Sequence, residues 1–312
     1  MTTELRRYDP SRDFIRVRDF LINTYGAFEK PLNWGLERWS YARYFTAPYL
    51  CKNEEITPEK SERAIGLWEG CIGVWDDDSD GIVGVVHTEH PWLGDAFIQR
   101  HPDHPHLMEE MLDFAESELV DPEKRSLRLF VYEHDAALLS LVRERGYRKS
   151  MDASDYDQEH VIGEIPGPNL PHGYTITSMA ERNDLEGRGR AFGLGFNHPD
   201  PIHWVPVHVY EELQRAPDYR RDLDLYAVDR NGEIASFCIV WYDAVNRVGS
   251  LEPVGTVPHY RKQGLAREVI FEGLRRASAL GARKVVVGGG NRFYESIGFK
   301  KTITCHDWVK EF

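Results

Sequence analysis

The second half of the chain, from residue 174 to residue 299, shows both the helical and the strand period of apolar residues. The strongest helical pattern ends at Gly281, which suits a left-handed cap, and its apolar stripe consists of Leu265, Val269, Ile270, Leu274, Ala277 and Leu280. Weaker helical patterns cover Leu185–Phe192, Val205–Arg215 and Phe293–Ile297. Strands are predicted over Tyr174–Ser178, Leu223–Asp229, Ile234–Tyr242, Val248–Val257 and Val285–Val287. This order of elements predicts an α/β domain.

The first half repeats this order with weaker patterns. Helices are predicted over Phe14–Thr24, Gly35–Tyr44, Leu107–Leu119 and Ala136–Arg145. Strands are predicted near Leu5 and over Ile72–Trp75, Ile82–Glu89, Ala96–Gln99 and Leu127–Tyr132. Short runs at Gly146 and His101 match runs at Gly298 and Val257 with nearly equal offsets, so we expect two copies of one fold. The Pro- and Gly-rich segment Ile165–Gly173 separates them, which predicts domains at residues 1–165 and 166–312.

Composition narrows the range of partners. The chain of 312 residues has 51 acidic and 38 basic side chains, and this excess of negative charge disfavours nucleic acid and anionic membranes as partners. Its cysteines, Cys51, Cys71, Cys238 and Cys305, lie far apart and form no C-x-x-C pair, as in proteins of a reducing compartment. No apolar run reaches the ~20 residues that span a bilayer, and no signal peptide is visible. We therefore expect a cytoplasmic protein.

The run from Val257 to Arg267 is the most informative segment, because it joins a strand to the strongest helix. Such a junction presents unpaired backbone N–H groups and the positive end of the helix dipole. Small residues at Gly264 and Ala266 leave the backbone accessible, and Arg261 and Lys262 add positive charge in an acidic chain. A pyrophosphate group fits this pattern. An ordinary helix start with solvated basic residues fits it equally well.

The same run resembles the R/Q-x-x-G-x-G/A signature of the GNAT acyltransferase superfamily, with Arg261, Gly264 and Ala266 at the defining positions. The run from Asn291 to Phe299 resembles the element that closes GNAT domains, although its interval to Tyr294 is shorter than in many members. The resemblance implies two tandem α/β domains, each a central mixed, mostly antiparallel sheet flanked by helices. It also implies that acetyl-CoA is bound between two splayed strands and that a primary amine attacks the thioester.

The resemblance also implies the site residues. The cofactor-binding set would be Gly255, Val257, Arg261, Lys262, Gln263, Gly264, Leu265, Ala266, Arg267 and Asn291. Pro253 and Gly255 interrupt the preceding strand, and backbone N–H groups near Gly255–Val257 are expected to polarise the thioester carbonyl. Glu252 is the expected base, or else an outward-facing carboxylate on an alternating strand. Tyr294 is the expected acid for the departing thiolate, or else a packing aromatic.

The function expected from this resemblance is acetyl transfer from acetyl-CoA to a small-molecule amine. Two alternatives remain open: a non-catalytic sensor or scaffold that binds acyl-CoA, and an acetyltransferase acting on protein N-termini or lysines. The aromatic residues Trp204, Trp241 and Tyr242, with the acidity of the chain, favour a cationic or amphipathic amine as acceptor.

The first domain is expected to be a degenerate copy that does not bind acetyl-CoA. Its loop has Pro105, Met108 and Glu110 at the positions of Arg261, Gly264 and Ala266, and Val142 replaces Tyr294. Proline lacks an N–H donor, methionine adds bulk and glutamate repels phosphate.

Two further patterns in the first half are typical of metal sites. The run from Asp76 to Gly81 partly matches a calcium loop, and five histidines lie between His87 and His106. The calcium pattern has a histidine where the last glutamate belongs, and the histidine spacing fits no zinc motif, so no metal site is predicted.

Overall fold

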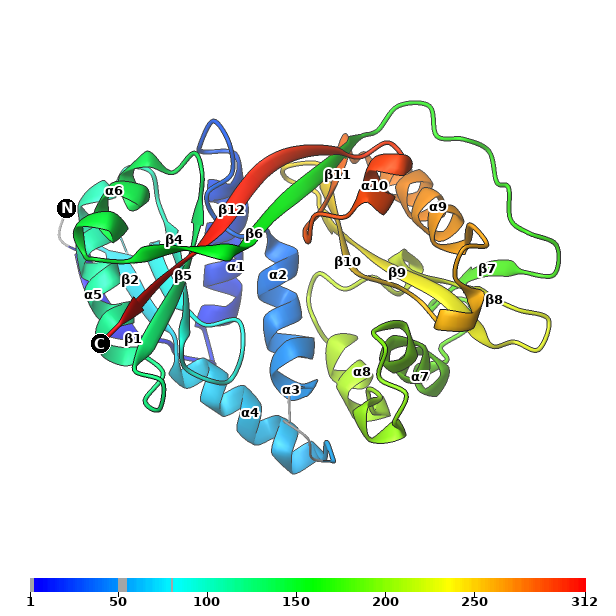
Figure 1. Cartoon of the computed structure of the whole chain (residues 1–312), viewed down its shortest axis with the longest axis horizontal. Coiled ribbons are helices and arrows are strands. Elements are labelled where there is room, and N and C mark those ends of the chain that lie inside the picture. Colours follow the sequence, from blue (N-terminus) through cyan, green and yellow to red (C-terminus); the bar gives the residue numbers. More distant parts are fainter. Residues whose placement is uncertain (1–2, 50–54, 80) are drawn as a thin grey trace. The chain divides into compact units, whose positions relative to one another are not determined.

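The structure, a computed structural model, describes residues 3–49, 55–79 and 81–312, without the side chains of residues 152–154. The chain forms two compact units (Figure 1). Unit 1 consists of Met1–Leu50, Glu62–Tyr156 and Thr302–Phe312, and unit 2 of Cys51–Ser61 and Asp157–Lys301. The α/β fold with two tandem domains is thereby confirmed.

Unit 1 is built on a mixed sheet in which β4 and β5 are parallel and the other described neighbours are antiparallel. In sheet order, its strands are β1 (Thr3–Arg7), β2 (Gly73–Asp77), β3 (Ile82–His87), β4 (Asp95–Arg100), β5 (Ser126–Tyr132) and β12 (Lys300–Glu311). Its helices are α1 (Asp13–Tyr25), α2 (Leu36–Tyr41), α3 (Ala47–Tyr49), α4 (Pro58–Gly70), α5 (Met108–Glu118) and α6 (Ala136–Glu144).

Alternating residues of the unit 1 sheet pack into two apolar cores, because successive side chains of a strand point to opposite faces. Val86 of β3 packs in the cluster that includes Met111 of α5. Val85, the preceding residue, packs in the cluster that includes Trp39 of α2 and Trp68 of α4. Helices therefore cover both faces of this sheet.

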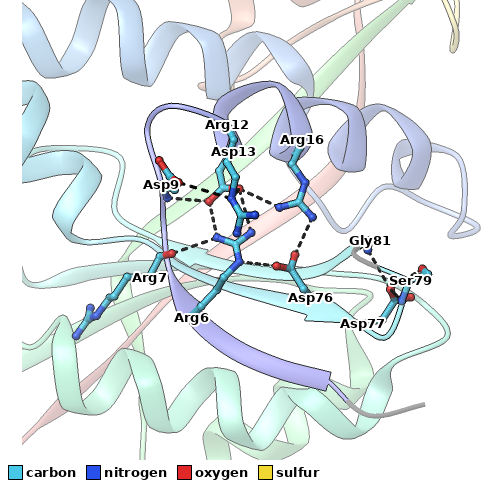
Figure 2. A network of polar contacts seen from close by, with 10 residues as sticks. All are labelled: Arg6, Arg7, Asp9, Arg12, Asp13, Arg16, Asp76, Asp77, Ser79 and Gly81. Carbon is cyan, nitrogen blue, oxygen red and sulfur yellow. Dashed lines mark hydrogen bonds and ion pairs between the residues drawn. The ribbon is translucent and has the colours of Figure 1, made fainter.

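A polar network ties β1, α1 and β2 of unit 1 together (Figure 2). The fully buried carboxylate of Asp13 accepts hydrogen bonds from Arg6 and Arg16, and from the backbone N–H of Asp9 at 2.7 Å. Arg6 and Arg16 both also bind Asp76 on β2. Burial alone would raise the pKa of Asp13, but these hydrogen bonds and charges hold it below its usual value.

Unit 2 is also built on a mixed sheet, with β10 and β11 parallel. In sheet order, its strands are the end of β6 (Arg148–Val161, with residues 157–161 in unit 2), β11 (Lys284–Val287), β10 (Val248–Thr256), β9 (Ile234–Asp243), β8 (Asp224–Val228) and β7 (Thr175–Ser178). Its helices are α7 (Leu185–Gly195), α8 (Val207–Leu213), α9 (Leu265–Leu280) and α10 (Arg292–Ser296). Most of the apolar stripe of α9 packs on this sheet with residues of β8, β9 and β11, whereas Leu280 is exposed. The helix has the predicted limits.

The two units exchange their last strands. The end of β6 pairs with β11 in unit 2, from Gln158 opposite Val287 to Val161 opposite Lys284. The end of β12 pairs with β5 in unit 1, from Cys305 opposite Tyr132 to Glu311 opposite Ser126. The compact units therefore differ from the predicted boundary after residue 165: residues 157–165 belong to unit 2 and residues 302–312 to unit 1.

Several features that the sequence singled out have ordinary structural roles. Asp77 closes the β2–β3 turn by accepting hydrogen bonds from the backbone of Ser79 and Gly81, while Asp80 lies outside the described residues. Cys71 and Cys238 are buried free thiols, and Cys51 also lies outside the described residues. Within the described ranges, no helix combines the length and apolar character needed to cross a membrane.

Candidate functional site

The centre of unit 2 contains a break in the pairing of β10. Strands β9 and β10 pair regularly up to Leu251 opposite Val240, and pairing resumes with Val254 opposite Cys238 after a register shift at Glu252 and Pro253. On the other side, β10 pairs with β11 only from Val248 to Ser250. Beyond Ser250, β10 therefore has an open edge toward β11. This geometry matches the splayed strands that the sequence led us to expect.

The open edge of β10 offers two backbone N–H groups, of which one lies in the expected range Gly255–Val257. The Val257 N–H, expected to polarise a carbonyl, instead donates to Ala235 O on the β9 side at 3.0 Å. Since N–H groups alternate along a strand, those of Val254 and Thr256 point toward the open edge. Gly255 has a packing role, because a Cβ there would lie 2.3 Å from Phe237 Cζ.

The loop before α9 has the backbone of an anion-binding nest. Lys262 and Gly264 adopt left-handed conformations, with φ of 63° and 82°. The residues from Arg261 to Gly264 are exposed, and α9 begins immediately after them at Leu265. The first N–H groups of a helix have no partner within it, so those of Leu265, Ala266 and the next residue add to the nest. The local geometry fits a pyrophosphate group.

The side chains of this loop are largely engaged with the protein itself. Arg261 donates to Thr256 O at 3.0 Å, Gly195 O at 2.8 Å and Asn197 Oδ1 at 2.9 Å. Gln263 accepts a hydrogen bond from the Tyr174 hydroxyl, and Arg267 pairs with the buried carboxylate of Glu268. These side chains shape the loop, so a bound anion would rely mainly on the backbone and on Lys262.

Tyr294 lies on α10 beside the core of unit 2. Its ring packs against Phe293 and Phe299, with centroids 5.3 Å and 5.6 Å away. Burial raises the pKa of Tyr294, and the nearby groups of Cys238 and Glu252 raise it further. The phenol is therefore protonated at neutral pH. The electrostatic effect of Glu252 shows that the two predicted catalytic side chains lie in one region.

Glu252 is held at the register shift through its backbone. The indole N–H of Trp241 donates to Glu252 O at 2.8 Å, and Trp241 itself is buried. The Glu252 side chain is partly exposed. Trp241 thus stabilises the irregular backbone on which the candidate base sits.

Asn291 caps the N-terminus of α10. Its Oδ1 accepts a hydrogen bond from Phe293 N at 2.9 Å, and its own N–H donates to Gln158 Oε1 at 2.9 Å. The sequence analysis missed Gln158, which lies on β6 and is fully buried. A buried glutamine in a polar strand has no sequence signal, because its partner is distant in the chain.

The three aromatic residues expected to favour a cationic acceptor do not form one surface. Trp241 and Tyr242 are neighbours on β9, so they point to opposite faces, and the Tyr242 hydroxyl binds Leu280 O. Trp204 lines a separate cavity of about 860 Å³ in unit 2, together with Arg190 and Glu233. None of the predicted site residues lines that cavity.

The histidines of the first half do not gather into one metal site. His87 is buried in the unit 1 core against Trp34, and burial lowers its pKa to about 4. His101, His104 and His106 line a cavity of about 690 Å³. The residues that the structure describes contain no group of three or more His, Cys, Asp or Glu side chains placed to hold a metal ion.

Comparison with known proteins agrees with this geometry. The acetyltransferase (GNAT) family matches residues 192–299, which lie entirely within unit 2. Residues 192–299 form a GNAT acetyltransferase domain. No curated protein is significantly similar to the chain in sequence.

Solved GNAT structures match the whole chain in fold. A tandem GNAT protein from the clavulanic acid biosynthesis pathway, solved without AcCoA, aligns with a TM-score of 0.65 at 12% identity, covering 99% of this chain and 98% of that one. A GCN5-related N-acetyltransferase from Sphaerobacter thermophilus aligns with a TM-score of 0.62 at 15% identity, covering 99% and 95%. At these identities the likeness concerns the fold alone, and it extends the GNAT architecture to unit 1.

Proposed function

We propose that unit 2 transfers an acetyl group from acetyl-CoA to the primary amine of a small molecule by direct attack. The observation that carries this proposal is the register shift at Glu252 and Pro253, which leaves an open edge of β10 near Tyr294. The N–H groups of Val254 and Thr256 would bind the pantetheine arm and polarise the thioester carbonyl. The nest from Arg261 to Ala266 would hold the pyrophosphate.

Glu252 is the candidate base of this reaction, and Tyr294 is the candidate partner of the departing sulfur. An ammonium group cannot attack, so Glu252 would accept a proton from the acceptor, directly or through water. The neutral amine nitrogen then bonds to the carbonyl carbon and loses its second proton to solvent as the carbon–sulfur bond breaks. The Tyr294 hydroxyl would donate a hydrogen bond to the departing sulfur. Since a thiol of pKa ~8.5 is a stronger acid than this phenol, exchange with solvent would complete protonation of the thiolate.

Release of free CoA thiol from acetyl-CoA, measured with a panel of primary amines, tests this function. We expect release that depends on the amine and falls strongly in a Glu252→Gln variant. Binding of acetyl-CoA without thiol release would favour the sensor or scaffold. Release only with peptide N-termini or lysine side chains would favour a protein acetyltransferase. Nucleic acid and membranes are not proposed as partners, because the formal net charge is -13.

A further inference from the structure

The short helix α10 depends on contacts outside itself for its position. It has five residues, Arg292–Ser296, and it follows the run Gly288-Gly289-Gly290. Glycine restricts the backbone least, and a helix this short is not stable alone. The orientation of Tyr294 therefore depends on what holds the two ends of α10.

Both ends of α10 contact the exchanged end of β6. At the start, Gln158 Oε1 accepts the hydrogen bond from Asn291 N, and the Asn291 carbonyl in turn accepts one from Tyr294 N at 3.0 Å. At the other end, the His160 ring lies 5.2 Å from the Phe299 ring. Phe299 N donates to Tyr294 O at 3.0 Å.

The choice of glutamine at position 158 is not explained by packing. Its side chain is fully buried, and its Nε2 has no hydrogen-bond partner among the described residues. An unpaired buried amide N–H costs about 1–3 kcal/mol, so methionine of similar length would pack at lower cost. The opposite amide orientation would turn two donors toward each other at Asn291 N. The carbonyl oxygen is therefore the useful part of this side chain.

We infer that Gln158 is a positioning residue for Tyr294: it anchors α10 through Asn291 so that the phenol faces the open edge of β10. This inference rests on the proposed function for the role of Tyr294, but the anchoring itself does not. It also means that the segment before the Pro- and Gly-rich linker supplies part of the catalytic unit.

Gln158→Met in the full chain tests the anchor, because it keeps the length of the side chain and removes the acceptor. Asn291 is exposed, so water can accept its N–H and the fold should persist. We expect kcat to fall about tenfold, the worth of one hydrogen bond, with the affinity for acetyl-CoA unchanged. Gln158→Glu retains an acceptor oxygen and should recover most of the lost rate. Glu159→Gln, on the opposite face of β6, is the matched control and should leave kcat unchanged.

A double-mutant cycle separates positioning from a general structural role. If Gln158 acts through Tyr294, Gln158→Met should cost little further rate in a Tyr294→Phe background. An equal loss of rate in both backgrounds would overturn the inference.

Amide hydrogen exchange tests the anchor without any turnover. In Gln158→Met, the amides from Asn291 to Ile297 should exchange about tenfold faster, while those of α9 stay unchanged. Unchanged exchange over α10 would overturn the anchor even in an active enzyme. Faster exchange in a protein that releases no thiol would instead support the anchor and reject the acetyltransferase function.

Discussion

The central strands of the two units have the same arrangement but differ in the regularity of their pairing. In unit 1, β3 and β4 pair without a break, from Gly84 opposite Arg100 to His87 opposite Phe97. In unit 2, β9 and β10 pair from Ser236 opposite Thr256 but shift register at Glu252 and Pro253. Counting back equally from Arg100 and Thr256 places Ala96 where unit 2 has Glu252. β4 pairs with β5 only at Asp95 and Ala96, so its later residues also face an unpaired edge, but the strand has no register shift and alanine supplies no base.

The backbone at the end of β4 is also occupied by the protein itself. His101 N donates to Val83 O, as Val257 N donates to Ala235 O, so Arg100 corresponds to Thr256. The side chain of Asn33 accepts from Arg100 N and donates to Arg100 O, both at 2.9 Å. The amide that unit 2 leaves open is thus already bound in unit 1.

The remaining expected losses in unit 1 have structural counterparts. No residue from His101 to Met108 has a positive φ, so the loop lacks the nest of unit 2. Pro105 begins a short 3-10 helix, Met108 is buried, and Glu110 lies in the first turn of α5. Tyr147 N donates to Val142 O as Phe299 N donates to Tyr294 O, which places Val142 at the position of Tyr294. Small local differences in sequence therefore separate the copy that we propose to bind acetyl-CoA from the copy that is expected to be silent.

The largest effect should come from separating the two halves of the chain. A fragment of residues 166–312 lacks the end of β6, which pairs with β11, and leaves the end of β12 without β5. We expect this fragment to lack a cooperative unfolding transition in circular dichroism. A fragment of residues 157–301 keeps the part of β6 that pairs with β11, together with β7 to β11, and is the matched control. A folded, active 166–312 fragment would show that the exchange is dispensable.

The strand exchange could not be predicted from the sequence, whereas several local features could. The limits of α9, the glycine-rich turns and the loop at Gly264 follow from local patterns that need no partner. The strands β6 and β12 were not predicted, because polar residues such as Asp155, Asp157 and Glu159 hide the period of two in β6. Pairing partners are set by contacts far apart in the chain, so no local pattern indicates that β12 joins β5. For the same reason, Gln158 and Asn33 escaped notice.

The next effect in size concerns Tyr294. Unit 1 has Val142 at the corresponding position. Tyr294→Phe should lower kcat by ~10–10², the worth of a hydrogen bond to a charged group, while the affinity for acetyl-CoA holds. Because the pKa of Tyr294 is raised, the native enzyme should show no loss of kcat from this group up to pH 10. Tyr242→Phe, which removes a hydroxyl bound to Leu280 O, is the control in steady-state kinetics. An unchanged kcat in Tyr294→Phe would make this ring a packing residue.

A smaller effect should distinguish the loop before α9 in unit 2 from the loop before α5 in unit 1. Gly264→Glu places a carboxylate where phosphate would approach, so the affinity for acetyl-CoA should fall more than tenfold, or above ~1.4 kcal/mol, by calorimetry. Gly264→Ala imposes the same left-handed strain without the charge and should lose less affinity. His106→Glu, in the exposed loop of unit 1, should change nothing. Equal losses in Gly264→Glu and His106→Glu would mean that both units bind acetyl-CoA.

The smallest effect should appear in the pH dependence of stability. Two buried aspartates have pKa shifts of opposite sign. Asp13 of unit 1 is surrounded by arginines, which hold its pKa below 3.8, so its stabilising effect is lost as the pH falls below about 4. Asp224 of unit 2 has its pKa raised by burial, although Arg188 and the Tyr219 hydroxyl oppose this. The folded protein therefore takes up this proton first, and Asp224 favours folding more as the pH falls toward 3.8.

Denaturant unfolding of Asp13→Asn and Asp224→Asn between pH 6 and pH 3 tests this difference. One carboxyl group changes the free energy of unfolding by at most about 1.4 kcal/mol per pH unit. The stability deficit of Asp13→Asn should shrink as the pH falls, because the native chain loses the same interaction by protonation. For Asp224, the free energy of unfolding of the native chain should instead rise relative to that of Asp224→Asn as the pH falls. Parallel curves for both variants would show that the arginines around Asp13 do not outweigh its burial.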